Sequence, residues 1–207
     1  MKKTYQGINL LRISLILVMI ASFLIIIRFD IVILISEFVS ILAFVLELIG
    51  IIKLTKQNKR FLAVLILLSI SLTLSFSNGS MYTIKYIALN QSFPNKETFI
   101  ALLNYLIISF ASIVSVITVI INFNIARGLK ELSSVDRTKN YAIIIIIINL
   151  IVFSIAGIFD VMNVVKDTIT LAISSTIFNF IGNLLLLELL SRLKKEYATN
   201  LILSKNA

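Results

Sequence analysis

The sequence predicts an all-α membrane protein, a polytopic bundle of six transmembrane helices with both termini in the cytoplasm. Three observations lead to this prediction. Hydrophobic residues make up 59% of the chain, whereas soluble domains contain roughly 45–50% apolar residues. Apolar runs recur that are each long enough to cross about 30 Å of hydrocarbon. The Lys and Arg residues gather between these runs, mostly on alternate connections.

The chain is expected to form a single transmembrane domain over 1–207, because no long stretch lacks an apolar run. Only helices suit segments of this length, since backbone polar groups in lipid must be satisfied within the segment. The predicted spans lie near 8–28, 31–54, 61–77, 98–126, 141–163 and 168–191. Residues 78–97 are predicted to form the outer loop, and residues 192–207 a basic cytoplasmic tail that lies against anionic lipid.

The individual spans differ in how clearly their ends are marked. The first follows two lysines and stays apolar through Ile27 without a cleavage pattern, so it predicts a span rather than a signal peptide. The third is the shortest apolar run, with Ser and Thr residues along its outer end. Within the outer loop, residues 81–89 predict either a short surface helix or an ordered loop. Pro94 marks the beginning of the fourth span, where its missing N–H costs nothing.

The cationic residues test the orientation independently. With the N-terminus inside, all but four of the 19 Lys and Arg residues fall on the cytoplasmic side. The four outer residues are Arg28, Lys85, Lys96 and Lys166. This distribution obeys the positive-inside rule and predicts a bacterial cytoplasmic membrane protein. The net charge of +9 then indicates anionic lipid headgroups, and not nucleic acid, as the partner.

The cytoplasmic ends of spans two, four and six share a pattern, in residues 46–53, 123–130 and 187–194. Glu47, Asn124 and Glu188 occupy matching positions, and each is followed by Lys six residues later. This indicates three helical hairpins related by repetition. The alternative is that every cytoplasmic helix end needs a polar residue and a Lys.

Small and polar residues recur with three- and four-residue spacing along one side of several helices. The stripes are Ser36, Ser40, Ala43, Glu47 and Gly50 in span two; Asn104, Ala111, Ser115, Thr118 and Asn122 in span four; Ala142, Asn149, Ala156, Asp160 and Asn163 in span five; and Ala172, Ser175, Asn179 and Gly182 in span six. Such stripes bring helices close together and allow hydrogen bonds between them. They predict either packing surfaces alone or a polar pathway through the bundle.

Ionisable residues inside the spans are the sharpest functional candidates, because each costs at least ~2.5 kcal/mol to insert. Glu47 comes first, since it lies on the small-residue face about 9 Å along the axis from Lys53. It predicts a proton-coupling carboxylate or a structural hydrogen bond to a nearby Ser or Asn. The candidate polar site consists of Glu47, Asn124, Asn149, Asn179 and Asp160.

Three weaker candidates, and Asp160 of the candidate site, lie nearer the ends of the spans. Glu37 is expected to pair with Arg28 or to reach toward the outer surface. Glu188 is expected to form an ordinary ion pair with Arg192, four residues later. Asp160 is expected to flank the turn between the fifth and sixth spans.

The chain lacks the residues that most catalytic sites use. It contains no Cys and no His, which excludes disulfides, thiolate or imidazole metal sites, Cys nucleophiles and His bases. Phosphate-binding loops, hydrolase serine motifs and zinc-protease motifs are also absent. No span sets a Ser and a Lys facing each other. The sequence therefore predicts no enzyme, no cofactor and no metal.

Two classes of function remain. In the first, the protein is a non-catalytic membrane component that packs with or stabilises another membrane protein or a second copy of itself. In the second, it transports a small solute or ion through a polar stripe, with Glu47 as the coupling group. The unbroken spans favour the first class, since transporter sites are often marked by Gly- or Pro-broken helices.

Overall fold

The structure, a computed structural model, describes residues 2–26, 30–166 and 169–206. Its six helices are α1 (Lys2–Ile26), α2 (Asp30–Thr55), α3 (Arg60–Leu89), α4 (Lys96–Leu132), α5 (Asp136–Lys166) and α6 (Ile169–Asn206). The prediction of an all-α fold with six long helices is confirmed, and the described residues contain no strand.

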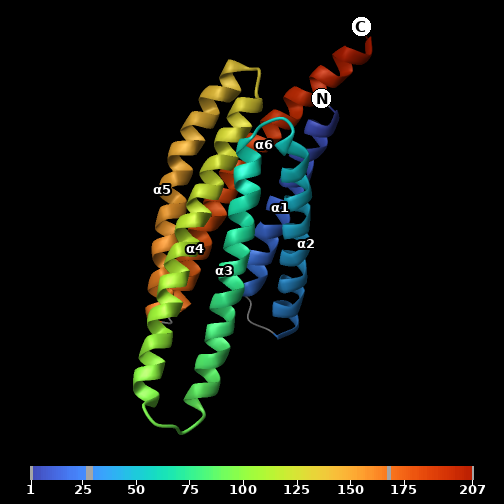
Figure 1. The fold of residues 1–207 in the computed structure, drawn as a ribbon. Helices are drawn as coiled ribbons and strands as arrows, with labels where there is room; N and C mark the ends of the chain where they lie inside the picture. Colours follow the sequence, from blue (N-terminus) through green and yellow to red (C-terminus); the bar gives the residue numbers. More distant parts are fainter. Residues whose placement is uncertain (1, 27–29, 167–168, 207) are drawn as a thin grey trace.

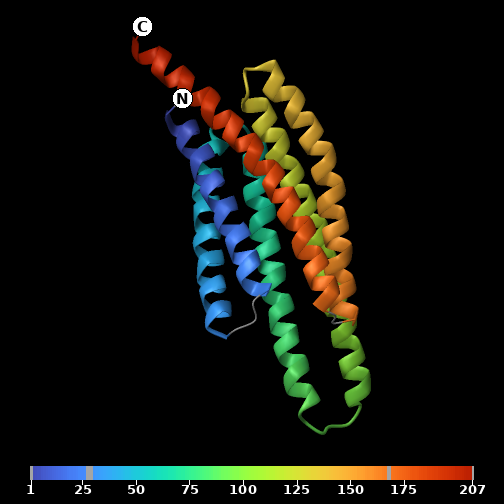
Figure 2. The same cartoon turned by 180° about the vertical axis from the view of Figure 1, so that it is seen from behind.

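The six helices form a ring. Each helix contacts the next one along the chain, and α6 returns to pack against α1 (Figures 1 and 2). A smaller contact between α4 and α6 places α5 toward the outside of the ring. Both chain termini lie at the same end of the bundle. Side chains from helices far apart in the sequence can therefore meet in the centre.

All six helices are long and apolar enough to cross a membrane. Helix α2 shows what they expose: Ile31, Leu34 and Phe38 are 74%, 69% and 70% accessible. An apolar surface of this extent suits hydrocarbon better than water. The helices are thus compatible with a multi-pass membrane protein.

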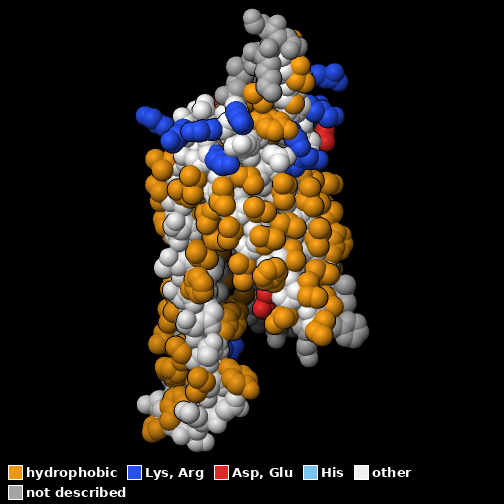
Figure 3. Space-filling view, turned by 90° about the vertical axis from the view of Figure 1, so that its right-hand side faces the viewer, with side chains coloured by type: hydrophobic (Ala, Val, Ile, Leu, Met, Phe, Trp, Pro, Cys, Tyr) orange, Lys and Arg blue, Asp and Glu red, His pale blue; other side chains and the backbone are white. Residues whose placement is uncertain are grey.

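The charged residues mark one end of the bundle. Figure 3 shows Lys and Arg side chains gathered in a band near the termini, above a broad hydrophobic belt. We call this the basic end; it comprises the beginnings of α1, α3 and α5 and the ends of α2, α4 and α6. The buried core lies mainly in the adjoining half, where Ile8, Ile51, Phe61, Leu129 and Leu193 pack together.

The predicted outer loop over 78–97 needs correction. Helix α3 continues without interruption to Leu89, and Lys96 already belongs to α4, so α3 and α4 project beyond the other helices (Figure 1). Ser77, Ser80 and Thr83 each donate to a carbonyl oxygen four residues earlier, which satisfies their hydroxyls inside a helix. The sequence 81–89 is thus helical, but as part of α3 rather than as a separate surface helix.

The actual turn at the tip of this projection is short. The side-chain amide of Asn90 donates to the Tyr86 carbonyl oxygen at 3.1 Å and ends α3. Pro94 then precedes Asn95, whose φ of 59° is left-handed; Asn tolerates this conformation better than most residues. Helix α4 begins directly afterwards, as the position of Pro94 predicts.

Over the predicted basic tail, 192–207, α6 remains helical to Asn206, and the first part of this segment packs on the protein. Its cytoplasmic side and its contact with anionic lipid stay predictions. Glu196 accepts hydrogen bonds from the Ser133 hydroxyl and from the amide and hydroxyl of Ser134, at 2.6–2.8 Å. The Tyr197 hydroxyl donates to the Leu132 carbonyl oxygen at 2.9 Å. Polar groups at the α4–α5 turn thus form hydrogen bonds with this segment. The hydropathy pattern carries no information about such contacts.

Candidate functional site

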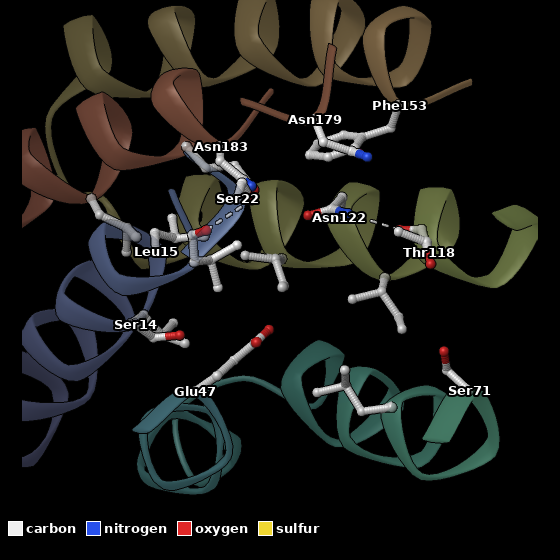
Figure 4. A pocket seen from close by; sticks show the side chains of 17 residues that line it. Ser14, Leu15, Ser22, Glu47, Ser71, Thr118, Asn122, Phe153, Asn179 and Asn183 are labelled. Carbon is white, nitrogen blue, oxygen red and sulfur yellow. Dashed lines mark hydrogen bonds between the residues drawn. The ribbon is translucent and has the colours of Figure 1, made fainter. Parts of the chain in front are cut away.

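A polar cavity lies at the centre of the ring, and all six helices contribute to its wall. Its volume is about 310 Å³, within the range of small-molecule sites. Apolar side chains form roughly half of the lining. Its polar lining residues are Ser14, Ser22, Glu47, Ser71, Thr118, Asn122, Asn179 and Asn183 (Figure 4).

Glu47 is the ionisable group of this cavity; among the described lining residues no other side chain carries a charge. Helix α2 packs against α1 through small residues, so that a Cβ on Gly50 would lie only 3.1 Å from the Gly7 carbonyl oxygen. Ala43 is fully buried on the same face. Glu47 lies between these two contacts and therefore points inward, as Figure 4 shows. In the described part of the chain its carboxylate has no ion-pair or hydrogen-bond partner.

Ser14, on α1, faces the same space as Glu47 (Figure 4). Its side chain is only 1% exposed, and its hydroxyl finds no partner among the described residues. Buried polar groups are nearly always hydrogen-bonded to protein or to ordered water. The unsatisfied hydroxyl and carboxylate therefore mark a part of the cavity where water or a ligand would complete the hydrogen bonding.

Three of the remaining polar groups donate hydrogens to the protein itself. The Asn122 amide donates to the Thr118 carbonyl oxygen, and the Thr118 hydroxyl to the Val114 carbonyl oxygen, both at 2.9 Å. Ser22 donates to the Val18 carbonyl oxygen at 2.8 Å. The two hydroxyls keep their lone pairs, and the Asn122 amide keeps its oxygen and a second N–H, so this part of the wall can both accept and donate.

Asn179 connects the cavity with a second carboxylate. Its amide donates to the Ser175 hydroxyl at 3.3 Å, and Ser175 donates to Asp160. Ser175 is buried, whereas Asp160 is exposed on α5. The pair joins α5 to α6, so Asp160 does more than flank the turn that follows it. The sequence placed Asp160 and Asn179 in one site, and the structure links them through Ser175.

Three other candidates do not line the cavity. The Asn124 amide donates to the Ile120 carbonyl oxygen of its own helix. Asn149 is 1% exposed, and neither polar atom of its side chain has a partner among the described residues. Glu188 pairs with Arg192 at 2.9 Å, the ion pair that the four-residue spacing predicts. The structure thus keeps Glu47 and Asn179 from the predicted site and separates Asn124 and Asn149 from them.

For the last two candidates, the prediction is that Glu37 pairs with Arg28 or reaches toward the outer surface. Arg28 lies outside the described residues. Glu37 is exposed on α2, and no described residue pairs with it.

The three positions that match in the predicted hairpin repeat have different surroundings. Glu47 faces the cavity, Asn124 bonds to its own helix and Glu188 forms an ion pair at the surface.

Several residues that line the cavity are not part of the site predicted from the sequence. Thr118 and Asn122 were recognised in the stripe of span four but not as part of the site. Asn183 and Ser22 were not recognised at all. The four-residue spacing of Asn179 and Asn183 is the signal that could have found the second asparagine, because it places both on one helix face. In the described residues no group of three or more acidic side chains could hold a metal ion.

Comparison with known proteins adds no relative: no family model, no characterised protein sequence and no solved structure matches this chain.

Proposed function

We propose that this protein is a transporter of a small solute or ion, in a bacterial cytoplasmic membrane, with Glu47 as the coupling carboxylate. The observation that supports this best is the polar cavity, to which all six helices contribute and in which Glu47 has no described partner. A channel or carrier needs such a site near the bilayer interior. A bundle held together by packing alone needs none.

The energetics of Glu47 support a coupling role. An uncompensated charge inside a membrane protein is expensive and marks ion or proton pathways. The carboxylate is stabilised when it binds either a proton or a cationic solute. Alternation between these two states would link solute movement to the proton gradient. Because the helices are unbroken, side chains rather than exposed backbone groups would hold the solute.

Orientation follows from the basic end. The α2–α3 and α4–α5 connections and both termini lie there, with most of the Lys and Arg residues. By the positive-inside rule this end faces the cytoplasm. The projecting tip of α3 and α4 then faces outward.

Transport can be tested in proteoliposomes that contain a trapped pH dye, by adding small amines, alkali cations, neutral solutes and carboxylates in turn. At least one solute should change the internal pH when the native protein is present. Glu47→Gln should lower that rate about tenfold or more, because it removes the group that exchanges a proton. Glu37→Gln, on the same helix but exposed, is the matched control. No response to any solute class would contradict the proposal.

A second candidate function is support of another membrane component, and a surface feature favours it. A groove of about 490 Å³ runs between α4 and α5, lined by small residues such as Ser115, Ser154 and Gly157. Small residues allow a further helix to approach closely. This function predicts a membrane partner, or a second copy, that co-purifies in mild detergent equally well with Glu47→Gln.

A further inference from the structure

The donors and charges around the central cavity indicate what kind of ligand it binds. We propose that the cavity binds a small organic ammonium ion, whose N–H groups donate to Glu47 and to the oxygen atoms beside it. This inference rests on the transport site proposed above and names its substrate class.

The described residues supply no cation for Glu47. The two basic side chains nearest along its own and the neighbouring helix are held elsewhere: Lys53 donates to Gln6 at 3.2 Å, and Arg12 to Ser191 at 3.1 Å. At the basic end, Arg60 and Arg127 share Glu131, and Arg192 pairs with Glu188. A proton or a cation bound in the cavity would therefore neutralise the Glu47 carboxylate, and the proposed ligand supplies that cation.

The cavity offers oxygen acceptors besides the Glu47 carboxylate. The hydroxyls of Ser22 and Thr118 and one N–H of Asn122 donate to backbone carbonyls, and one N–H of Asn179 donates to Ser175. The hydroxyl lone pairs and the amide oxygens can accept, while each amide keeps a second N–H as a donor. Together with the carboxylate, these acceptors suit a ligand with two or three N–H groups. An anion would meet the Glu47 carboxylate in a lining where no described side chain carries a positive charge.

The size and the apolar wall favour an organic cation over a bare metal ion. A volume of about 310 Å³ corresponds to the volume of about ten water molecules in the liquid, at roughly 30 Å³ each. A dehydrated alkali ion would leave most of that space empty. Leu15, Ile121 and Phe153 line the remainder, and they can cover a short hydrocarbon chain attached to the ammonium group.

Phe153 gives the apolar wall a defined shape. It is 4% exposed, and a Cβ at Gly182 would lie 2.6 Å from its ring, so the absence of a side chain at Gly182 makes room for the ring. The ring lies beside Asn179 in Figure 4. A polar part that contains Glu47 and an apolar part thus lie within the same cavity.

The test uses the purified full chain in lipid nanodiscs and saturation-transfer NMR. The probes are butylammonium and three comparisons: 1-butanol of matched length, butyrate of opposite charge, and tetramethylammonium without N–H donors. We expect butylammonium to bind and to be displaced by excess methylammonium but not by Na⁺. Equal signals from 1-butanol, binding of butyrate, or displacement by Na⁺ would each overturn the inference.

Variants separate this inference from transport itself. Glu47→Gln should weaken butylammonium binding by about tenfold to a hundredfold, since a charge-assisted hydrogen bond is lost, while Glu37→Gln should leave it unchanged. Thermal unfolding of each variant shows that it is folded. Binding without any solute flux would contradict the transport proposal and keep this inference. Flux of a neutral or anionic solute, without ammonium binding, would support the transport proposal and contradict this inference.

Discussion

At the scale of single residues, two glutamates on α6 show how the position of a carboxylate decides how much it contributes to stability. Glu188 forms an exposed pair with Arg192 on the same helix face, and such pairs stabilise by only about 0.3–0.5 kcal/mol. Glu196 accepts three hydrogen bonds from Ser133 and Ser134, more than 60 residues away in the sequence. It holds the turn between α4 and α5 and satisfies a backbone amide at that turn.

Glu196→Ala should therefore destabilise the protein more than Glu188→Ala. We expect a loss of about 1–3 kcal/mol for Glu196, since a turn amide and two hydroxyls lose their charged acceptor, and less than about 0.5 kcal/mol for Glu188. Amide hydrogen exchange should quicken at residues 133–136 in Glu196→Ala alone. Equal stability of the two variants, or unchanged exchange at the turn, would contradict this role.

At the scale of helices, the contact between α1 and α2 depends on glycine. A Cβ on Gly7 would lie 2.9 Å from Leu54, and one on Gly50 would lie 3.0 Å from Leu11. The two backbones approach closely there, as small residues allow in membrane helix pairs. This contact holds α2 on α1 and so directs Glu47 into the cavity.

Gly50→Val should separate α1 from α2, because the added side chain meets the carbonyl oxygen of Gly7 as well as Leu11. Overpacking of this kind typically costs about 1–3 kcal/mol. Gly79→Val is the matched control, since a Cβ there meets nothing within 4 Å and the change in helix propensity is the same. Unfolding of the purified proteins by heat measures both; a Gly50 variant as stable as the Gly79 variant would be evidence against close packing.

At the scale of the whole molecule, hydrogen bonds and ion pairs between distant segments close the basic end of the ring. Asn58 and Arg60, beside the α2–α3 turn, bind Glu131 of α4 at 2.7 and 2.6 Å. Arg12 of α1 reaches Ser191 of α6, and the Arg192 guanidinium stacks on Tyr141 of α5 at 3.9 Å. These contacts fix the connections on one side, while the opposite side ends in the α3–α4 projection.

The proposed orientation makes this end cytoplasmic, and cysteine labelling can check it in a chain without native cysteines. Single variants Gln57→Cys and Val135→Cys should react with an impermeant maleimide only after the cells are opened. Gln91→Cys, at the projecting tip, should react in intact cells. All three side chains are exposed, so access depends on the side of the membrane. Labelling of residues 57 and 135 from outside would reverse the orientation.

Hydropathy and charge, both local properties, were enough to predict six helices and the grouping of the basic connections. The pattern failed over 78–89 because Ser, Thr and Asn lower the hydropathy without ending a helix when their side chains bond to the preceding turn. For the α6 tail, the hydropathy pattern carried no information about packing, because the groups that hold Glu196 and Tyr197 belong to a turn about 60 residues away.

The sequence by itself determined that Glu47 lies on a small-residue face, since a 3.6-residue period assigns every side chain to one side of its helix. Only the tertiary structure decided what that face meets. Closure of α6 onto α1 brings Asn179 and Asn183 to the cavity that Glu47 and Asn122 line, and it leaves Asn124 and Glu188 outside. Helix periodicity carries no information about which distant helix packs opposite, because that choice depends on contacts among all six.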